Sequence, residues 1–181
     1  KTETTQEDKT NQNDGNYEEK KMFNEGFERV RIYQNKILIW ERWFKNQLLN
    51  SYNDLPAYIR YYNNGYKKEE GWFKESKKHR DGDSPAFIKY DKNGIKEEEE
   101  WFKDNKRHRD NDLPASIGYY ANGNKWEEVW FKNDKIHRDG NPAWIEYYEN
   151  GNKKAEKWFK TGQRNRENDL PAEIKYYENG N

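Results

Sequence analysis

A tandem repeat of 28 or 29 residues is the feature of this sequence that most restricts its fold. Trp-Phe pairs recur at spacings of 29, 29, 29 and 28 residues, beginning at Trp43 and ending at Trp158. All five prolines occupy one phase of this period, each is followed by Ala, and the Gly of an Asn-Gly pair stands nine residues later. Repeats of this length are typical of proteins in which small structural units stack in a row. We therefore expect an elongated stack.

Each unit has the residue pattern of a β-hairpin. The segment Pro-Ala-x-Ile-x-Tyr alternates apolar and variable residues with the period of a strand, and a Glu-x-Trp-Phe segment returns after the Asn-Gly pair. We assign Asn64-Gly65 to a two-residue type I′ turn, in which both residues have positive φ. This register places Ile59 across from Glu70. It also places Tyr61 across from Lys68.

One face of each hairpin carries nearly the same side chains in every unit. Ala57 lies across from Trp72 in this register, so that a small side chain leaves room for a large indole. The Glu two residues before each Trp is expected to accept hydrogen bonds from tyrosine hydroxyls or from nearby arginines, and so to form a structural ladder. The structural residues expected on this face are Trp72, Trp101, Trp130 and Trp158, with Glu70, Glu99, Glu128 and Glu156.

The opposite face differs from unit to unit. Arg60 opposes Glu69 and Lys89 opposes Glu98, whereas Gly118 forms no such pair. The residue after each Pro-Ala also changes, so we expect a surface for a protein or carbohydrate partner there. The expected contacts are Tyr58, Phe87, Trp144, Tyr62, Tyr120, Tyr148 and Trp126. The alternative is that these aromatic side chains simply cover the second face.

The composition favours a thin aromatic core. Only 31% of the residues are hydrophobic and 38% are charged, which alone would suggest disorder. The aromatic content of 17% argues for folding, because each ring buries a large area and aromatic residues favour strands. The sequence therefore predicts an all-β fold, an elongated single-layer solenoid of stacked antiparallel β-hairpins.

The repeat divides the chain into five parts. Residues 1–13 are a polar tail by composition, residues 14–26 read as half a repeat, and residues 27–55 as a degenerate repeat hinged at Asn35-Lys36. Residues 56–170 hold four full repeats and residues 171–181 a terminal half repeat. The complementary halves suggest the hypothesis that molecules join head to tail into a filament. The alternative is that the polar tail caps an edge.

Three His-Arg-Asp triplets, which begin at His79, His108 and His137, raise the question of a metal site or acid–base chemistry. Strands lie about 4.8 Å apart, so equivalent histidines two or three strands away are roughly 10–14 Å apart. That separation is too large for shared ligation, because a metal bond to nitrogen is about 2 Å long. We expect each imidazole to pack on an indole, as His79 would on Trp72. A pH-sensitive contact and a catalytic or metal role are the alternatives.

Other features of the sequence argue against catalysis. There is no cysteine, Ser-His-Asp order, phosphate-binding Gly-rich loop or dinucleotide fingerprint. Lys plus Arg equals Asp plus Glu at 34 each, so no bulk charge attracts nucleic acid or an anionic membrane. The sequence therefore predicts a protein that is not an enzyme, binds no metal or cofactor, and does not bind nucleic acid.

The repeat resembles the variant-type MORN repeat in its long form. The motif His-Arg-Asp-Gly-x-Pro-Ala at residues 137–143 carries the resemblance, together with the recurring Asn-Gly and Trp-Phe elements, over about residues 27–181. The first copy keeps only Trp43-Phe44 of these elements, and residues 165–167 replace the triplet in the fourth full copy. The resemblance implies hairpins stacked into a long twisted sheet that serves as an interaction scaffold. It also implies contact with lipid head groups, as in some MORN proteins, or an antitoxin role, as some bacterial relatives are labelled.

We therefore expect a non-enzymatic repeat protein that presents an extended β surface to a protein partner. A self-assembling, filament-forming protein and an antitoxin-like binding protein are the alternatives. The chain begins at Lys1 without an initiator Met, which slightly favours a processed, secreted or cell-surface protein.

Overall fold

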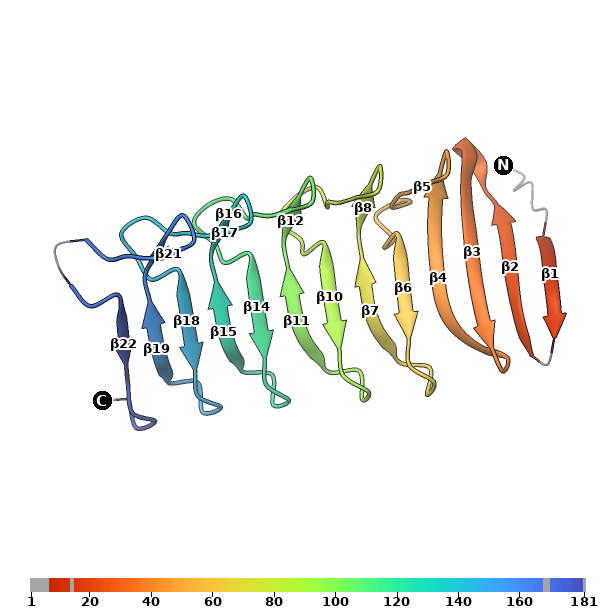
Figure 1. Ribbon diagram of the computed structural model, residues 1–181. Coiled ribbons are helices and arrows are strands. Elements are labelled where there is room, and N and C mark those ends of the chain that lie inside the picture. Colours follow the sequence, from red (N-terminus) through yellow and green to blue (C-terminus); the bar gives the residue numbers. More distant parts are fainter. Residues whose placement is uncertain (1–6, 14, 168–169, 181) are drawn as a thin grey trace.

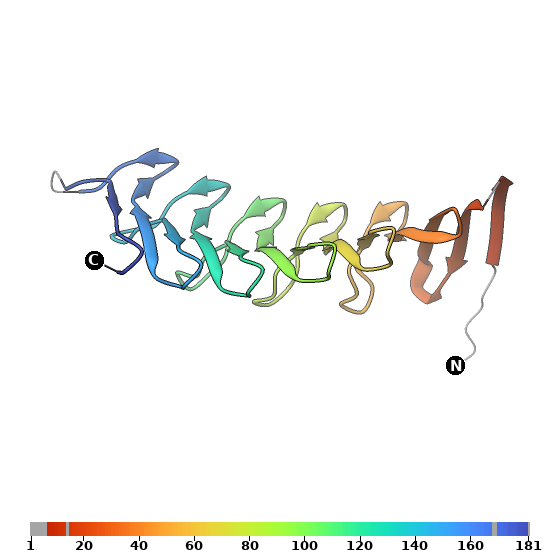
Figure 2. The same ribbon diagram turned by 90° about the horizontal axis from the view of Figure 1, so that it is seen from below.

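The computed structural model describes residues 7–13, 15–167 and 170–180 and shows the predicted all-β fold. Fourteen strands form one open antiparallel sheet along the length of the molecule (Figure 1). The hairpins follow one another in chain order, so that the first and last strands lie at opposite ends. Seen from below, the units form a single row (Figure 2). The predicted single-layer stack of hairpins is therefore confirmed.

The strands belong to two kinds of hairpin. The large sheet contains, in spatial order, β1 (Glu7–Asn13), β2 (Asn16–Met22), β3 (Phe27–Gln34), β4 (Ile37–Lys45), β6 (Tyr58–Tyr61), β7 (Lys67–Gly71), β10 (Phe87–Tyr90), β11 (Lys96–Glu100), β14 (Ser116–Tyr119), β15 (Lys125–Val129), β18 (Trp144–Tyr147), β19 (Lys153–Lys157) and β22 (Glu173–Lys175), and β5 (Leu48–Leu49) pairs with β4. Four small hairpins lie at the upper edge in Figure 1: β8 (Phe73–Lys74) with β9 (Lys77–Lys78), β12 (Phe102–Lys103) with β13 (Lys106–Arg107), β16 (Phe131–Lys132) with β17 (Lys135–Ile136), and β20 (Phe159–Lys160) with β21 (Gln163–Arg164). A short 3-10 turn, η1 (Asn24–Gly26), joins β2 to β3.

The Asn-Gly turns are longer than the type I′ turns that we predicted. The amide of Tyr62 donates to the carbonyl of Tyr66 at 2.9 Å, so the loop contains three residues. Gly65 has a φ of +85°, whereas Asn64 is not among the residues with positive φ. A three-residue loop with one left-handed Gly also matches the right-handed twist of the strands. The prediction of a two-residue loop here is therefore wrong.

The longer loop changes the register on one side of the hairpin. Ile59 pairs with Glu70 as predicted, but Tyr61 pairs with Lys67 and not with Lys68. Lys68 is the extra residue of a β-bulge, and the same shift recurs in the following three hairpins of the sheet. The bulge therefore adds one residue per unit on the face of the sheet opposite to that of Ile59.

The type I′ geometry occurs in the other turns instead. Both turn residues have positive φ at Asn35-Lys36, which confirms the hinge that we predicted in the degenerate repeat. The same is true of the small-hairpin turns at Glu75-Ser76, Asp104-Asn105 and Asn133-Asp134. Each of these turns also bonds to the preceding unit; for example, the Ser76 amide donates to the Leu49 carbonyl at 2.8 Å. The small hairpins are thus linked into a second row.

The N-terminal part differs from the prediction. Residues 7–13 form strand β1, which pairs with β2, and so the prediction of a polar tail is wrong for these residues; residues 1–6 lie outside the described part. Backbone pairing with β2 requires no apolar pattern, which is why composition did not reveal this strand. The turn before β2 is confirmed at Gly15, with a φ of +83°, while Asp14 is not described. The β2 edge used by the head-to-tail hypothesis is already paired with β1.

One face of the sheet, which we call the uniform face, carries a row of alternating Glu and Ile across the strands. The row runs Glu41, Ile59, Glu70, Ile88, Glu99, Ile117, Glu128, Ile145, Glu156, Ile174. A tyrosine hydroxyl from the following unit donates to each of the last four glutamates in 2.5–2.7 Å bonds: Tyr90 to Glu70, Tyr119 to Glu99, Tyr147 to Glu128, and Tyr176 to Glu156. The predicted ladder of tyrosine–glutamate bonds is therefore confirmed.

The core of each unit is small and shared with its neighbour. Trp72 is 5% exposed and packs with Ala86 and Ile88 of the next unit, and the pattern recurs at Trp101 and Trp130. The alanines after the first four prolines are fully buried. Burying an indole removes roughly 150–250 Å² from water, or up to about 4–6 kcal/mol. Much of the apolar stabilisation therefore lies between units.

Candidate interaction surface

The second face of the sheet, which we call the variable face, holds two rows whose members change from strand to strand. The upper row is Arg42, Tyr58, Gly71, Phe87, Glu100, Ser116, Val129, Trp144, Lys157, Glu173. The lower row is Trp40, Arg60, Glu69, Lys89, Glu98, Gly118, Glu127, Glu146, Ala155, Lys175. The bulge residues Lys68, Glu97, Trp126 and Lys154 lie beside the lower row.

The small hairpins cover the upper row. The Tyr58 ring lies 5.7 Å from that of Phe73, and the Trp144 ring 6.4 Å from that of Phe159. Phe87 packs against the cluster that contains Phe102. Tyr58, Phe87 and Trp144 are therefore half-buried, with much of their ring area used in packing. Their assignment to a partner surface stays a prediction.

Three other predicted contacts join neighbouring units at the lower edge of the sheet. The hydroxyls of Tyr62, Tyr120 and Tyr148 donate to backbone carbonyls of the next unit at 2.8–2.9 Å. The Asn64 side chain makes a similar bond of 2.7 Å to the carbonyl of Lys92. These tyrosines thus have a structural role, whether or not they also touch a partner.

Trp126 is the predicted contact that remains accessible. Its side chain is 39% exposed and lies against Gly118: a Cβ at that position would be 2.2 Å from the Trp126 indole nitrogen. The other units carry Arg60, Lys89 and Glu146 where this unit has Gly118. The glycine therefore makes the space in which this indole rests.

The surroundings of Trp126 are acidic. Glu98, Gly118, Glu127 and Glu146 are successive members of the lower row. Burial, and then repulsion by Glu98, raises the pKa of Glu127 to about 7, and repulsion by Glu146 adds to the rise. Glu146 is paired with Lys157, so its charge is partly offset. This part of the face favours positively charged groups.

The N-terminal end of the variable face has the opposite charge. Trp40 lies between two arginines, with the guanidinium carbons of Arg42 and Arg60 at 4.4 and 4.7 Å from its ring. A hollow beside it is also lined by Lys68 and Lys92. The variable face is thus divided into a basic end and an acidic middle.

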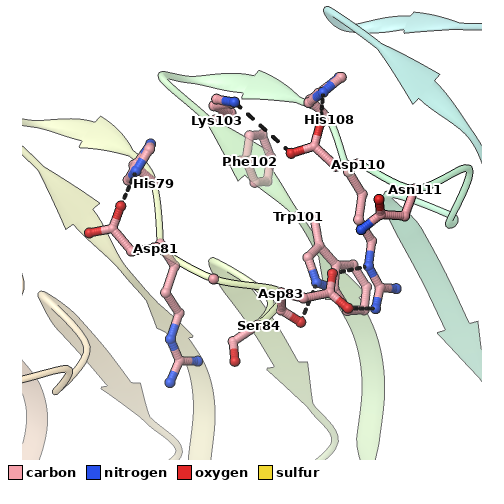
Figure 3. Close-up of a pocket in the computed structure, with 13 residues that line it drawn as sticks. His79, Asp81, Asp83, Ser84, Trp101, Phe102, Lys103, His108, Asp110 and Asn111 are labelled. Carbon is pink, nitrogen blue, oxygen red and sulfur yellow. Dashed lines mark hydrogen bonds and ion pairs between the residues drawn. The ribbon is translucent and has the colours of Figure 1, made fainter.

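A second hollow lies at the upper edge, between successive His-Arg-Asp loops (Figure 3). Figure 3 shows His79 and His108 each beside an aspartate and Asp83 beside Trp101. The imidazole Nε2 of His79 is 3.1 Å from Asp81, and its Nδ1 accepts from the Asp104 amide at 3.3 Å. A similar hollow occurs in the preceding unit, and another lies two units further along the stack. Such repetition favours a structural role.

The arginine of each triplet, and not the histidine, covers the indole. The guanidinium carbon of Arg109 is 3.8 Å from the Trp101 ring, and its nitrogens bond Asp83 at 2.7 and 2.9 Å. These bonds lower the pKa of Asp83. Arg80 covers the face of Trp72 in the same way, at 3.9 Å from the ring centre, so the predicted contact of His79 with this indole is left only for the ring edge. Arginine has a long side chain and a planar guanidinium, so it can stack on the indole and pair with an aspartate at the same time. The shorter histidine side chain cannot reach both groups.

Sequence reasoning missed the residues that make the variable face unusual. In the lower row, the position of Trp40 is taken by a glutamate in each of the next three hairpins: Glu69, Glu98 and Glu127. Gly118 stands in the same row among charged residues. These departures from the repeat were visible in the sequence. The bulge that places Trp126 over Gly118 was not, because it depends on the loop geometry.

Comparison with protein-family models, with curated proteins and with solved structures found no match. The described residues include no group of three or more His, Cys, Asp or Glu that could hold a metal ion. In the same part of the chain, no helix has the length and apolar character needed to cross a membrane.

Proposed function

We propose that this chain is a non-enzymatic scaffold whose variable face binds a protein partner. The observation that supports this proposal most is the contrast between the two faces of one sheet. The uniform face repeats the same Glu and Ile from β4 to β22, and tyrosine hydroxyls bond four of those glutamates. The variable face changes on each strand and presents an exposed indole beside half-buried carboxylates. Stacking explains the first pattern but requires nothing of the second.

Trp126 is the best anchor for such a partner. An exposed indole is the kind of group that dominates binding energy at protein interfaces. Its acidic neighbours Glu98 and Glu127 would favour a partner group with positive charge. The resemblance to MORN repeats also implies a scaffold, which agrees with this proposal.

Selection from a random peptide display library tests this proposal. Peptides enriched on the intact chain should lose at least tenfold in affinity for Trp126→Ala, because the anchor is removed. The control variant Tyr177→Ala removes a ring that is 78% exposed and lies in the final turn; its affinity should not change. Equal losses for both variants, or no loss for either, would argue against the variable face as the binding surface.

A further inference from the structure

The hollow at the N-terminal end of the variable face is lined by three cationic side chains. Arg60, Lys68 and Lys92 line it together with Trp40, Asn63 and Asn64. No carboxylate is among the described residues that line this hollow. The chain as a whole has no net charge, so this concentration of positive charge is local. A binding site of this composition suits an anion.

Two of the three cationic side chains make contacts that position them before any ligand arrives. Arg60 lies against Trp40 and donates one bond of 3.2 Å, from Nη1, to Glu69. A guanidinium has five N–H donors, so Arg60 keeps donors for a ligand. The Lys68 ammonium lies 5.6 Å from the centre of the Tyr62 ring. Such preorganisation lowers the entropic cost of binding.

Among the described hairpins, a Trp at this position of the lower row, beside Arg60 and Lys68, occurs once. The next hairpin of the sheet has Glu97 and Glu98 at the positions of Lys68 and Glu69, and the third has Trp126 and Glu127. Trp40 itself belongs to the degenerate repeat, before the first full unit. A feature found once in a periodic structure is not required by stacking.

The neighbouring charges restrict the size of the anion. Glu69 lies directly opposite Arg60 and is already bonded to it. The next carboxylate of the lower row is Glu98, three strands from Arg60, and Glu127 follows two strands later. Strands are about 4.8 Å apart, so Glu98 is roughly 14 Å from Arg60. A nucleic acid or an anionic membrane surface would extend over them and be repelled. A short extended peptide of about four residues would not, since each residue spans about 3.3 Å.

We propose that this hollow binds a short acidic segment of the partner protein, whose carboxylates pair with Arg60, Lys68 and Lys92. Trp40 forms the apolar wall against which the backbone or a side chain of the segment packs. The inference rests on the proposed function, because it names the class of partner for one end of the variable face.

Fluorescence anisotropy with a labelled peptide of four glutamates, and the same peptide with four glutamines, tests this inference. The intact chain should bind the glutamate peptide at least tenfold more tightly, and the difference should shrink as salt is added. Lys68→Gln should weaken binding about threefold or more, and combining it with Arg60→Gln and Lys92→Gln should abolish it. The near-ultraviolet circular dichroism of each variant verifies that the stack is intact.

The chain offers a matched control at Lys154, which occupies the same bulge position and lies 5.9 Å from the Tyr148 ring. Lys154→Gln should leave binding unchanged, because Glu146 stands there at the position that Arg60 has in the hollow. Equal loss with Lys154→Gln would overturn the inference, as would binding of anionic lipid vesicles without binding of the glutamate peptide. Failure of the glutamate peptide while displayed peptides still depend on Trp126 would contradict this inference alone and leave the proposed function standing.

Discussion

The hydroxyl of Tyr90 donates a 2.6 Å hydrogen bond to the carboxylate of Glu70 in the preceding unit. Glu70 also accepts a 2.7 Å bond from Lys67. Burial, together with the bond to Glu70, raises the pKa of Tyr90. The bond therefore links two units through a group that stays protonated when free tyrosine would ionise.

Removing this hydroxyl should weaken the stack. We expect Tyr90→Phe to lower the free energy of unfolding by about 1–2 kcal/mol, because a half-buried bond to a charged group is lost. Urea denaturation followed by circular dichroism measures the change. Tyr66→Phe, at a tyrosine that is 54% exposed, should change stability little. If the two variants lose the same amount, the ladder does not stabilise the stack.

Replacing the clamp arginine tests whether its shape matters beyond its charge. Arg109→Lys keeps the charge but loses the two-point pairing with Asp83 and the stacking on Trp101. We expect a loss of about 1 kcal/mol in thermal or urea unfolding. The control Arg164→Lys changes a side chain that is 55% exposed, and its effect should be close to zero. A fully tolerated Arg109→Lys would contradict the role given to the guanidinium.

Two glycines on the variable face should respond differently to a methyl group. A Cβ on Gly71 would lie 2.5 Å from the Tyr58 ring, which is held by Phe73. We expect Gly71→Ala to cost about 1–3 kcal/mol through overpacking. Gly118→Ala should cost less than about 1 kcal/mol, because the exposed Trp126 indole can move aside. The opposite order would show that Tyr58 is not held under the small hairpin.

The acidic part of the variable face should make stability depend on pH. Because the pKa of Glu127 rises from 4.5 to about 7, the folded chain keeps a proton between those values that the unfolded chain releases. The contribution of Glu127 to the free energy of unfolding therefore falls as pH rises through that range. Glu127→Gln should stabilise the fold by about 1 kcal/mol at pH 8, after allowance for solvent screening, and not at pH 4. Glu149→Gln, in an exposed turn, serves as the control; an equal gain there would assign the effect to net charge.

Much of the architecture could be predicted from the sequence because repetition averages out local ambiguity. The recurring spacing located the hairpins, and alternation within one unit placed Ile59 across from Glu70. The tyrosine–glutamate ladder followed from having a Glu in the same phase of every unit. These predictions required only the period of a strand and the need to satisfy buried carboxylates.

The parts that the sequence did not reveal depend on geometry between segments. The Asn-Gly loop length differs by one residue between two common hairpin types, and that residue creates the bulge at Lys68. Composition could not show that the small hairpins fold over Tyr58 and Phe87, because polar and apolar residues mix in both segments. Strand β1 was missed because it pairs with β2 through backbone bonds, which leave no pattern in the sequence.

The division of roles between the two faces can be tested at adjacent residues. Lys125 bonds Glu128 on the uniform face, whereas its neighbour Trp126 lies over Gly118 on the variable face. A photo-crosslinking amino acid at position 126 or at position 125 would be irradiated in an extract of the source cells, and adducts would be counted by mass spectrometry. We expect a specific protein adduct from position 126 and little from position 125. Equal adducts from both positions, or more from position 125, would contradict the assignment of binding to the variable face.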